Sequence, residues 1–258
     1  MIAIRACSGL AELEACVQLQ TETWGMDASE IVPRKTFLLA QKIGGQVIGA
    51  YDSELAANGP ESLVGFLFAL PGIKKSAHEP RAYLHSHMLA VREPYRNQGL
   101  GTQLKLEQRL EAISRGIQLI EWTFDPLEIK NAYLNIHKLG AVVCRYEVDF
   151  YGVSSSRLQG GLPTDRLVAE WWLNSPRVLA AIERRQAAEH TFEECIPVPA
   201  SIYQWKASYA GRDQALAVQV ENRGRFQKAF AKGLTVLGFT RDPEGNGVYE
   251  LGLPTQPD

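Results

Sequence analysis

The segment from Tyr83 to Thr102 limits the possible folds of this chain more than any other segment. It begins with a run of alternating character, Tyr83 to Val91, that is typical of a β-strand. A polar loop containing Pro94 follows, and Gly99 and Gly101 then mark the start of a segment with helical spacing. A strand that leads through a short loop into a helix predicts a sheet with helices packed on it.

The flanking segments extend this pattern into a mixed sheet. On the C-terminal side we expect a strand at 119–124, a helix at 127–139 that ends at Gly140, and a strand at 141–150. On the N-terminal side we expect a helix from Ser8 to about Trp24, and strands at 1–7, 37–43, 46–51 and 63–70, the last closed by Pro71-Gly72. The glycine-led helix has an apolar stripe at Leu106, Leu110 and Ile113. Together these predict an α/β chain with a mixed α+β sheet.

The C-terminal third is less regular. Residues 167–173 are a candidate last strand of the core, and Ser175-Pro176 is typical of a helix start. Pro197 and Pro199 predict a linker. A helix over 214–231 and a hairpin formed by 234–240 and 248–251 follow. We therefore expect a core at 1–174 and a small α+β extension, helical with a β-hairpin, at 175–258.

Composition excludes several classes of protein. The net charge is −2 and no long basic run occurs, which argues against nucleic acid as a partner. The four cysteines form neither a CxxC pair nor a cluster with histidine, so we expect reduced thiols and no metal site. The N-terminus has no signal pattern, and no stretch reaches about 18 apolar residues. We therefore expect no membrane segment and a cytoplasmic location.

The glycine-led helix start is a candidate anion site. The first N–H groups of a helix lack partners within the helix, and the helix dipole adds positive charge there. Gly99 and Gly101 allow a phosphate to approach the backbone, and Arg96 adds a charge. A tight turn with a solvated arginine would explain the same residues. A dinucleotide fingerprint would need a glycine at Leu104, and a P-loop would need Gly-Lys-Ser/Thr where Gly101 is followed by Thr102; both patterns fail.

The run from Leu89 to Gly101 resembles motif A of the GNAT acyltransferase superfamily. That motif ends in Arg/Gln-x-x-Gly-x-Gly/Ala, which Arg96, Gly99 and Gly101 match. The resemblance covers roughly residues 1–173 in element order and implies the GNAT acyl-CoA N-acyltransferase fold, with acetyl-CoA as cosubstrate. It also implies which residues contact acetyl-CoA. The strand would pair with the pantetheine chain, and the loop would hold the pyrophosphate; these residues are Leu89, Ala90, Val91, Arg96, Asn97, Gln98, Gly99, Leu100, Gly101, Thr102 and, on the later helix, Asn131.

Three side chains are candidates for catalysis. Alternation places His85 and His87 on one face of the strand, together with Tyr83 and Leu89. An imidazole, with a pKa of about 6.5, suits removal of a proton from an amine, and a buried histidine bonded to a backbone carbonyl is the alternative interpretation of the pattern. Glu121 lies within an apolar strand, where it serves either the active site or a structural hydrogen bond.

The later helix departs from the family pattern. Many GNAT enzymes have a tyrosine, the acid for the leaving thiolate, where this chain has Ile136. Tyr133 lies one turn earlier, and Ile129 occupies the motif B asparagine position with Asn131 nearby. We expect Asp165 to be solvated at the surface. The sequence thus predicts an N-acetyltransferase acting on an unknown amine; a non-catalytic acyl-CoA sensor is the alternative, and the extension is a candidate dimerisation element.

Overall fold

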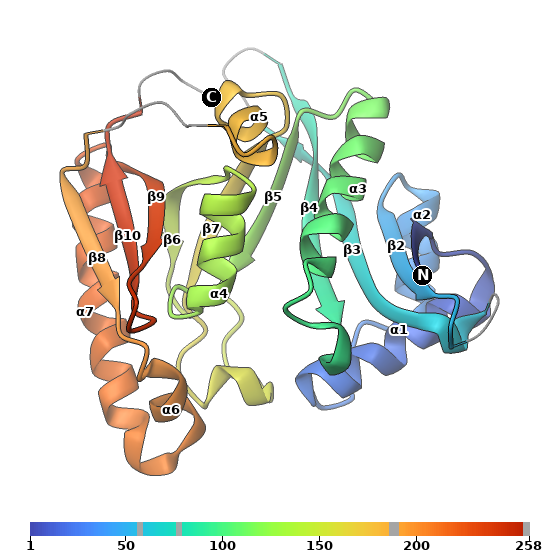
Figure 1. Ribbon diagram of the computed structural model, residues 1–258, viewed down its shortest axis with the longest axis horizontal. Helices are drawn as coiled ribbons and strands as arrows, with labels where there is room; N and C mark the ends of the chain where they lie inside the picture. The colour runs from blue at the N-terminus through green and yellow to red at the C-terminus, as the bar shows by residue number, and fades with distance from the viewer. Residues whose placement is uncertain (56–58, 76–78, 186–190, 255–258) are drawn as a thin grey trace. The chain divides into compact units, whose positions relative to one another are not determined.

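The computed structural model describes residues 1–258 except 56–58, 76–78, 186–190 and 255–258. The strands are β1 (Ile2–Ala6), β2 (Gln46–Asp52), β3 (Leu63–Lys74), β4 (Arg81–Val91), β5 (Leu119–Phe124), β6 (Val142–Glu147), β7 (Arg166–Trp172), β8 (Glu194–Val198), β9 (Thr235–Arg241) and β10 (Gly247–Gly252). The helices are α1 (Gly9–Trp24), α2 (Arg34–Lys42), α3 (Leu100–Ser114), α4 (Ile129–Ala132), α5 (Pro176–Ile182), α6 (Ile202–Ala207) and α7 (Arg212–Ala231) (Figure 1). The predicted mixed α/β class is confirmed.

The chain divides into two compact units, Met1–Glu121 and Trp122–Asp258, with the division inside β5. In the first unit the strands follow the order β1-β2-β3-β4-β5. Neighbouring strands are antiparallel from β1 to β4, whereas β4 and β5 are parallel. This arrangement is the predicted one: antiparallel strands first, then a strand-helix-strand unit in which α3 connects β4 to β5.

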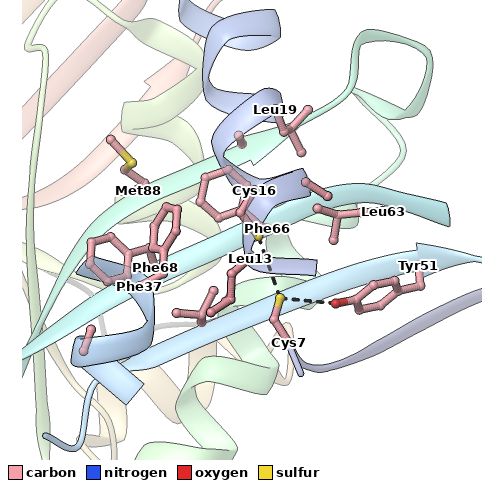
Figure 2. Close-up of a cluster of buried hydrophobic side chains, with 14 residues drawn as sticks. Cys7, Leu13, Cys16, Leu19, Phe37, Tyr51, Leu63, Phe66, Phe68 and Met88 are labelled. Carbon is pink, nitrogen blue, oxygen red and sulfur yellow. Dashed lines mark hydrogen bonds between the residues drawn. The ribbon is translucent and has the colours of Figure 1, made fainter. Parts of the chain in front are cut away.

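Helices α1 and α2 cover one face of the first unit's sheet (Figure 2). Phe37 of α2 meets Phe66 and Phe68 of β3 edge to face, with ring centroids 5.9 and 4.8 Å apart. Leu13 and Leu19 of α1 are fully buried in the same cluster. Each aromatic pair adds about 0.5–1.5 kcal/mol to the burial of its area, so this cluster fixes both helices on the sheet.

Helix α3 covers the opposite face. Leu100 and Leu104 pack there against residues of β2, β3 and β4. The predicted stripe is wrong, because Leu110 is 58% exposed whereas Leu104 and Ala112 are fully buried. The buried face of α3 could not be recognised from the sequence, because two of the residues on that face, Lys105 and Gln108, are polar.

The strand predicted at 37–43 is wrong, since Arg34–Lys42 form helix α2. Phe37 and Ala40, three residues apart, are its buried side chains. A short apolar run does not distinguish a strand from one turn of an amphipathic helix. Pro33, which directly precedes the helix, is the local signal that favours a helix start.

The strand predicted to close at Pro71-Gly72 continues to Lys74. Strand β2 pairs with β3 only as far as Ala69, so Pro71 lies where β3 has a partner on one side alone. A proline is tolerated on such an edge because its missing N–H is not required there. Gly72 lies against the ring of Tyr83. A Cβ atom at this position would come within 2.5 Å of the ring, so the ring would have to move for any larger residue.

The second unit contains the strand order β5-β7-β6-β9-β10-β8. Helix α7 packs on it through Phe226, whose ring lies 5.7 Å from that of Tyr146 and 5.1 Å from that of Tyr249. The helix predicted at 127–139 begins at Ile129 and becomes π-helical from Tyr133 to Lys138. The predicted cap at Ser175 is confirmed, because its side chain accepts a hydrogen bond from the backbone of Val178.

Residues beyond 175 continue the same sheet rather than forming a separate one. β9 joins β6, and β10 and β8 follow, so the predicted hairpin is confirmed as β9–β10. The predicted linker at Pro197 and Pro199 is wrong: Glu194–Val198 is strand β8, which pairs with β10 at the edge of the sheet, where proline is tolerated. The division at 174 between core and extension stays a prediction.

None of the described helices is long and apolar enough to cross a membrane.

Candidate functional site

Strand β4 contains one more residue than the segment of β3 with which it pairs. Phe68 is opposite Met88, and the next residue, Ala69, is opposite Ser86, so His87 is the extra residue. Such a β-bulge interrupts the ladder and re-aims the side chains beside it, and bulges are common next to active sites.

The bulge changes which side chains share a face. Ser86 lies on the α3 side, where its hydroxyl accepts a hydrogen bond of 2.9 Å from Lys105 Nζ. Met88 packs with α1 and α2, and Leu89 packs with α3. The expectation that Leu89 shares a face with the histidines is therefore wrong, because the bulge adds one residue to the alternation.

The two histidines lie together on the α1 and α2 side. The ring of His87 is 6.0 Å from that of Phe68 and 6.2 Å from that of His85. Burial lowers the pKa of His85 to about 4, with smaller contributions from His87 and Lys105, and burial also lowers the pKa of His87. Both imidazoles are therefore neutral near pH 7 and able to accept a proton.

Glu121 lies across from His85 in the parallel pair of β4 and β5. Its carboxylate is buried and forms an ion pair with Lys74, the last residue of β3. Lys74 was not predicted as a site residue, because its pairing with Glu121 requires β3 to continue past Pro71. The structure thus brings His85, His87 and Glu121 to neighbouring positions of two strands and adds a cation beside the carboxylate.

One edge of β4 is open within the first unit. The parallel pairing joins Leu84 to Ile120 and His85 to Glu121, and the described residues of Met1–Glu121 form no further pair on that side. The edge from His87 to Val91 therefore presents its backbone groups away from β3. An extended ligand with amide groups could hydrogen-bond to such an edge, as an added strand does.

The loop after β4 turns the chain into the N-terminus of α3. Asn97 and Gly99 both have left-handed backbones, with φ of 62° and 82°. Arg96 Nε donates a hydrogen bond of 2.9 Å to the carbonyl of Val91, and Gln98 Nε2 donates one of 2.7 Å to that of Pro94. These bonds tie the loop to the end of the strand.

The first turn of α3 is suited to an anion. No side chain caps it, and it contains no acidic residue. At Gly99, no atom lies within 4 Å of the position that a Cβ would occupy. The free N–H groups of Leu100, Gly101 and Thr102 and the positive end of the dipole are thus open to a phosphate.

The second unit holds the remaining predicted residues. Ile136 is fully buried and Tyr133 is half-buried. The Tyr133 ring stacks on His137 at 4.5 Å, and the guanidinium of Arg241, from β9, lies 4.6 Å from its centroid. Asn131 is exposed on α4. The family's tyrosine position is therefore occupied by a core residue, and the nearest tyrosine is held between two other side chains.

The segment from Asp125 to Lys130, which leads into α4, is held by the extension. Lys206 Nζ of α6 donates hydrogen bonds of 2.8 Å to Asp125 and 2.8 Å to Glu128, and its side chain is 5% exposed. The Tyr249 hydroxyl of β10 donates to the carbonyl of Pro126 at 2.8 Å. Sequence patterns gave no signal for these contacts, which join residues about 80 and 120 positions apart.

Asp165 was predicted to be solvated at the surface, and this prediction is wrong, because the residue is fully buried. Arg223 of α7 donates to both of its oxygens, at 2.8 and 3.0 Å, and the Tyr146 hydroxyl donates at 2.6 Å. A buried carboxylate requires such partners, so Asp165 is a structural anchor between α7 and β6.

Among the described residues, no group of three or more His, Cys, Asp and Glu side chains could hold a metal ion. The four cysteines are free thiols, as predicted.

No family model and no curated protein sequence matches the chain. Solved structures share its fold. NAA60 from Arabidopsis thaliana in complex with acetyl-CoA gives a TM-score of 0.55 at 16% identity, covering 68% of this chain and 100% of that one. NAA60 in complex with a bisubstrate analogue gives 0.52 at 17% identity, with 67% and 100% covered. The ribosomal-protein-S18-alanine N-acetyltransferase from Escherichia coli gives 0.50 at 14% identity, with 68% and 96% covered.

These similarities establish the fold. The acyl-CoA N-acyltransferase fold of the GNAT proteins, predicted from the strand, loop and glycines between Tyr83 and Thr102, is confirmed. Each neighbour matches nearly all of its own length but about two thirds of this chain, so about a third of this chain lies outside the shared fold.

The depressed pKa of His85 predicts a pH dependence of stability. Between about pH 6.5 and 4, the unfolded chain binds a proton at this residue and the folded chain does not, so the free energy of unfolding falls as the pH is lowered. His85→Gln removes this contribution, and urea unfolding at pH 7 and 5 should show a smaller loss for the variant than for the wild type. Equal losses in the two proteins would contradict the assignment.

The contacts of Lys206 predict a large effect of its removal. Lys206→Met leaves Asp125 and Glu128 next to each other without their cation, and should lower the free energy of unfolding by about 3–5 kcal/mol. Lys228→Met, an exposed lysine on α7, is the control and should change it by less than about 0.5 kcal/mol. Urea unfolding at pH 7 measures both, and similar values for the two variants would argue against the anchor.

Proposed function

Because the chain has the fold of the GNAT acetyltransferases, we propose that it binds acetyl-CoA and transfers the acetyl group directly to an amine. The observation that carries this proposal is the continuity of β4 with α3. A bulged strand with an open edge runs through a glycine loop into an uncapped helix N-terminus. Strand, loop and helix end together match a ligand that has both an amide-containing chain and a pyrophosphate.

The pyrophosphate is assigned to the residues from Arg96 to Thr102. The fit rests on two features, the open space at Gly99 and the absence of a side-chain cap or acidic residue in the first turn of α3. Asn97, with its left-handed backbone, and Gln98 complete the loop. A negative charge placed at Gly99 would occupy the space assigned to the phosphates.

The pantetheine chain is assigned to the open edge of β4. Leu89, Ala90 and Val91 would hydrogen-bond to its amides through their backbone. Backbone N–H groups at the bulge would orient the thioester and stabilise the oxyanion that forms during attack. A bulge serves this purpose because it releases backbone groups from the sheet ladder. Asn131 of α4 is retained as a further contact on the basis of the sequence resemblance alone.

Removal of the amine proton is assigned to His85 or Glu121, directly or through water, with His87 as a neighbouring candidate. His85 is neutral near pH 7 because its pKa is about 4, so it can accept a proton but binds it weakly. Glu121 forms an ion pair with Lys74 and lies across from His85 in the parallel pair. The thiolate then leaves without a dedicated acid, since Ile136 cannot donate a proton and Tyr133 is engaged by His137 and Arg241.

The acceptor is an amine of unknown identity. NAA60 and the S18-alanine N-acetyltransferase share the fold, and the name of the second specifies the acetylation of an alanine in a protein. Peptide α-amines are therefore the first acceptors to test, followed by small amines and lysine side chains. A non-catalytic acyl-CoA sensor is the second candidate function, and the buried Ile136 at the family's tyrosine position favours it. The cytoplasmic location and the homodimer remain predictions.

The pyrophosphate assignment predicts that Gly99→Glu weakens CoA binding by about tenfold or more, because it adds a negative charge at the positive end of α3. Gly116→Glu is the matched control. Gly116 follows the other end of the same helix, also has a positive φ, of 77°, and also has open space at the Cβ position. Isothermal calorimetry with CoA should give an affinity within about twofold of the wild type for this control. Equal CoA affinities for the two variants would contradict the assignment of the pyrophosphate to the N-terminus of α3.

Catalysis predicts that thiol is released from acetyl-CoA when a suitable amine is present. The panel contains peptides with different N-terminal residues, small amines and lysine-containing peptides, and free thiol is followed with a chromogenic disulfide. Glu121→Gln or His85→Gln should lower the rate by about 100-fold for the residue that accepts the proton, with CoA affinity unchanged. Binding of CoA without thiol release on any acceptor would support the sensor instead.

A further inference from the structure

Two buried cysteines of the first unit are in direct contact. Cys7 follows β1 and Cys16 lies in α1, and their sulfur atoms are 3.8 Å apart (Figure 2). Cys7 is 4% exposed and Cys16 is fully buried. A disulfide has sulfurs about 2.05 Å apart, so the two atoms need to approach by about 1.8 Å to form one.

A chain of polar groups connects Cys7 to solvent, which a purely apolar packing site would not require. The hydroxyl oxygen of Tyr51 is 3.2 Å from Cys7 Sγ and 2.6 Å from Glu12 Oε2. Arg5, whose side chain is 38% exposed, forms two hydrogen bonds to the Glu12 carboxylate, of 2.9 and 2.7 Å. The network thus connects the Cys7 sulfur through a hydroxyl and a carboxylate to a partly exposed guanidinium.

The same contacts make the two thiols unequal. Hydrogen bonds from Cys16 and Tyr51 to its sulfur lower the pKa of Cys7, whereas the contact with Cys7 raises the pKa of Cys16. The contacts with Cys16 and Tyr51 thus favour Cys7 as the thiol that gives up its proton first. A thiolate next to a second thiol is the arrangement in which oxidation proceeds to a disulfide.

We propose that Cys7 and Cys16 are a redox-active pair that closes an intramolecular disulfide on exposure to hydroperoxides. The Cys7 thiolate attacks hydrogen peroxide, which is reduced to hydroxide while Cys7 becomes a sulfenic acid. The Cys16 sulfur then displaces the sulfenic hydroxyl, forming the S–S bond, and the hydroxyl leaves with the Cys16 proton as water. In total two thiols and one hydrogen peroxide give one disulfide and two waters.

Closure of the disulfide requires a small movement of one of the two cysteines, and the structure allows it at the start of α1. The backbone of Cys7 is fixed, because its N–H donates to the carbonyl of Val47 and its carbonyl accepts from Gln41. The adjustment therefore falls on the start of α1. Gly9 lies there with a φ of 73° and with no atom within 4 Å of a Cβ position, so it can absorb a small backbone change. The pair belongs to the same buried cluster as Phe68 and Met88, which flank His87 in β3 and β4.

The test uses the double variant Cys144→Ser/Cys195→Ser, which removes the two exposed thiols and leaves the buried pair. The folded protein is treated with hydrogen peroxide, quenched with a thiol-alkylating reagent and measured by intact mass. Closure predicts a loss of about 2 Da without alkylation after denaturation, reversed by a reducing agent, and a peptide that links residues 7 and 16. A protein that stays reduced, or that gains oxygen without forming the link, overturns the proposal.

Two further variants in this background separate the roles of the thiols. Cys16→Ser should trap Cys7 as a sulfenic acid that a dimedone-type reagent labels, and Cys7→Ser should leave Cys16 reduced under the same conditions. The opposite pattern, with Cys16 labelled and Cys7 reduced, would overturn the assignment of Cys7 as the attacking thiol. Circular dichroism checks that each variant is folded, and the double variant alone keeps the main proposal falsifiable if one of them is not.

Discussion

The single extra residue in β4 is the constraint on which the candidate site depends. Without the bulge, alternation would place Ser86 and Met88 on the same face, so either a hydroxyl would enter the aromatic cluster or a thioether would enter the polar contacts of α3. With it, Ser86 reaches Lys105 while Met88 joins the cluster of Phe37 and Phe68. His85 and His87 stay together on the α1 and α2 side, while Leu89 moves to the side of α3. The geometry of the strand thus determines which side chains accompany the two histidines.

A buried polar network holds that strand to α3. Lys105 donates to Ser86 and Gln108, and Gln108 donates in turn to Gln46 of β2. Burial lowers the pKa of Lys105 well below its usual value, which favours a neutral amine. A neutral amine with satisfied hydrogen bonds costs far less to bury than an ammonium ion. The network therefore fixes one helix to the bulged strand, and the N-terminus of that same helix is the proposed phosphate site.

Local sequence signals predicted the parts of this arrangement that local chemistry determines. The strand, the polar loop and the glycines of 83–102 were found because turn residues and alternation act over a few positions. The bulge was not predicted, because it arises from the pairing of β3 with β4, and neither strand contains a residue that requires it. Helix α2 and strand β8 were misassigned for the same reason, because their conformation depends on contacts distant in sequence. Burial of Phe37 in the core favours the helix, and the position of Pro197 at the edge of the sheet allows the strand. Lys74 was missed because its partner, Glu121, is distant in sequence.

The contacts of residues 175–258 argue against a role limited to dimerisation. A detachable dimerisation element would contact its own unit weakly, whereas residues 175–258 supply three strands to the sheet and bind the segment leading into α4 at Asp125, Pro126 and Glu128. Removal of the chain after Cys195 would expose the edge of β6 and leave two carboxylates without their lysine. Such a truncation would change folding and association together, because an unpaired strand edge itself promotes self-association. The oligomeric state is therefore better measured on the full chain, because residues of α6 and β10 hold the segment that leads into α4.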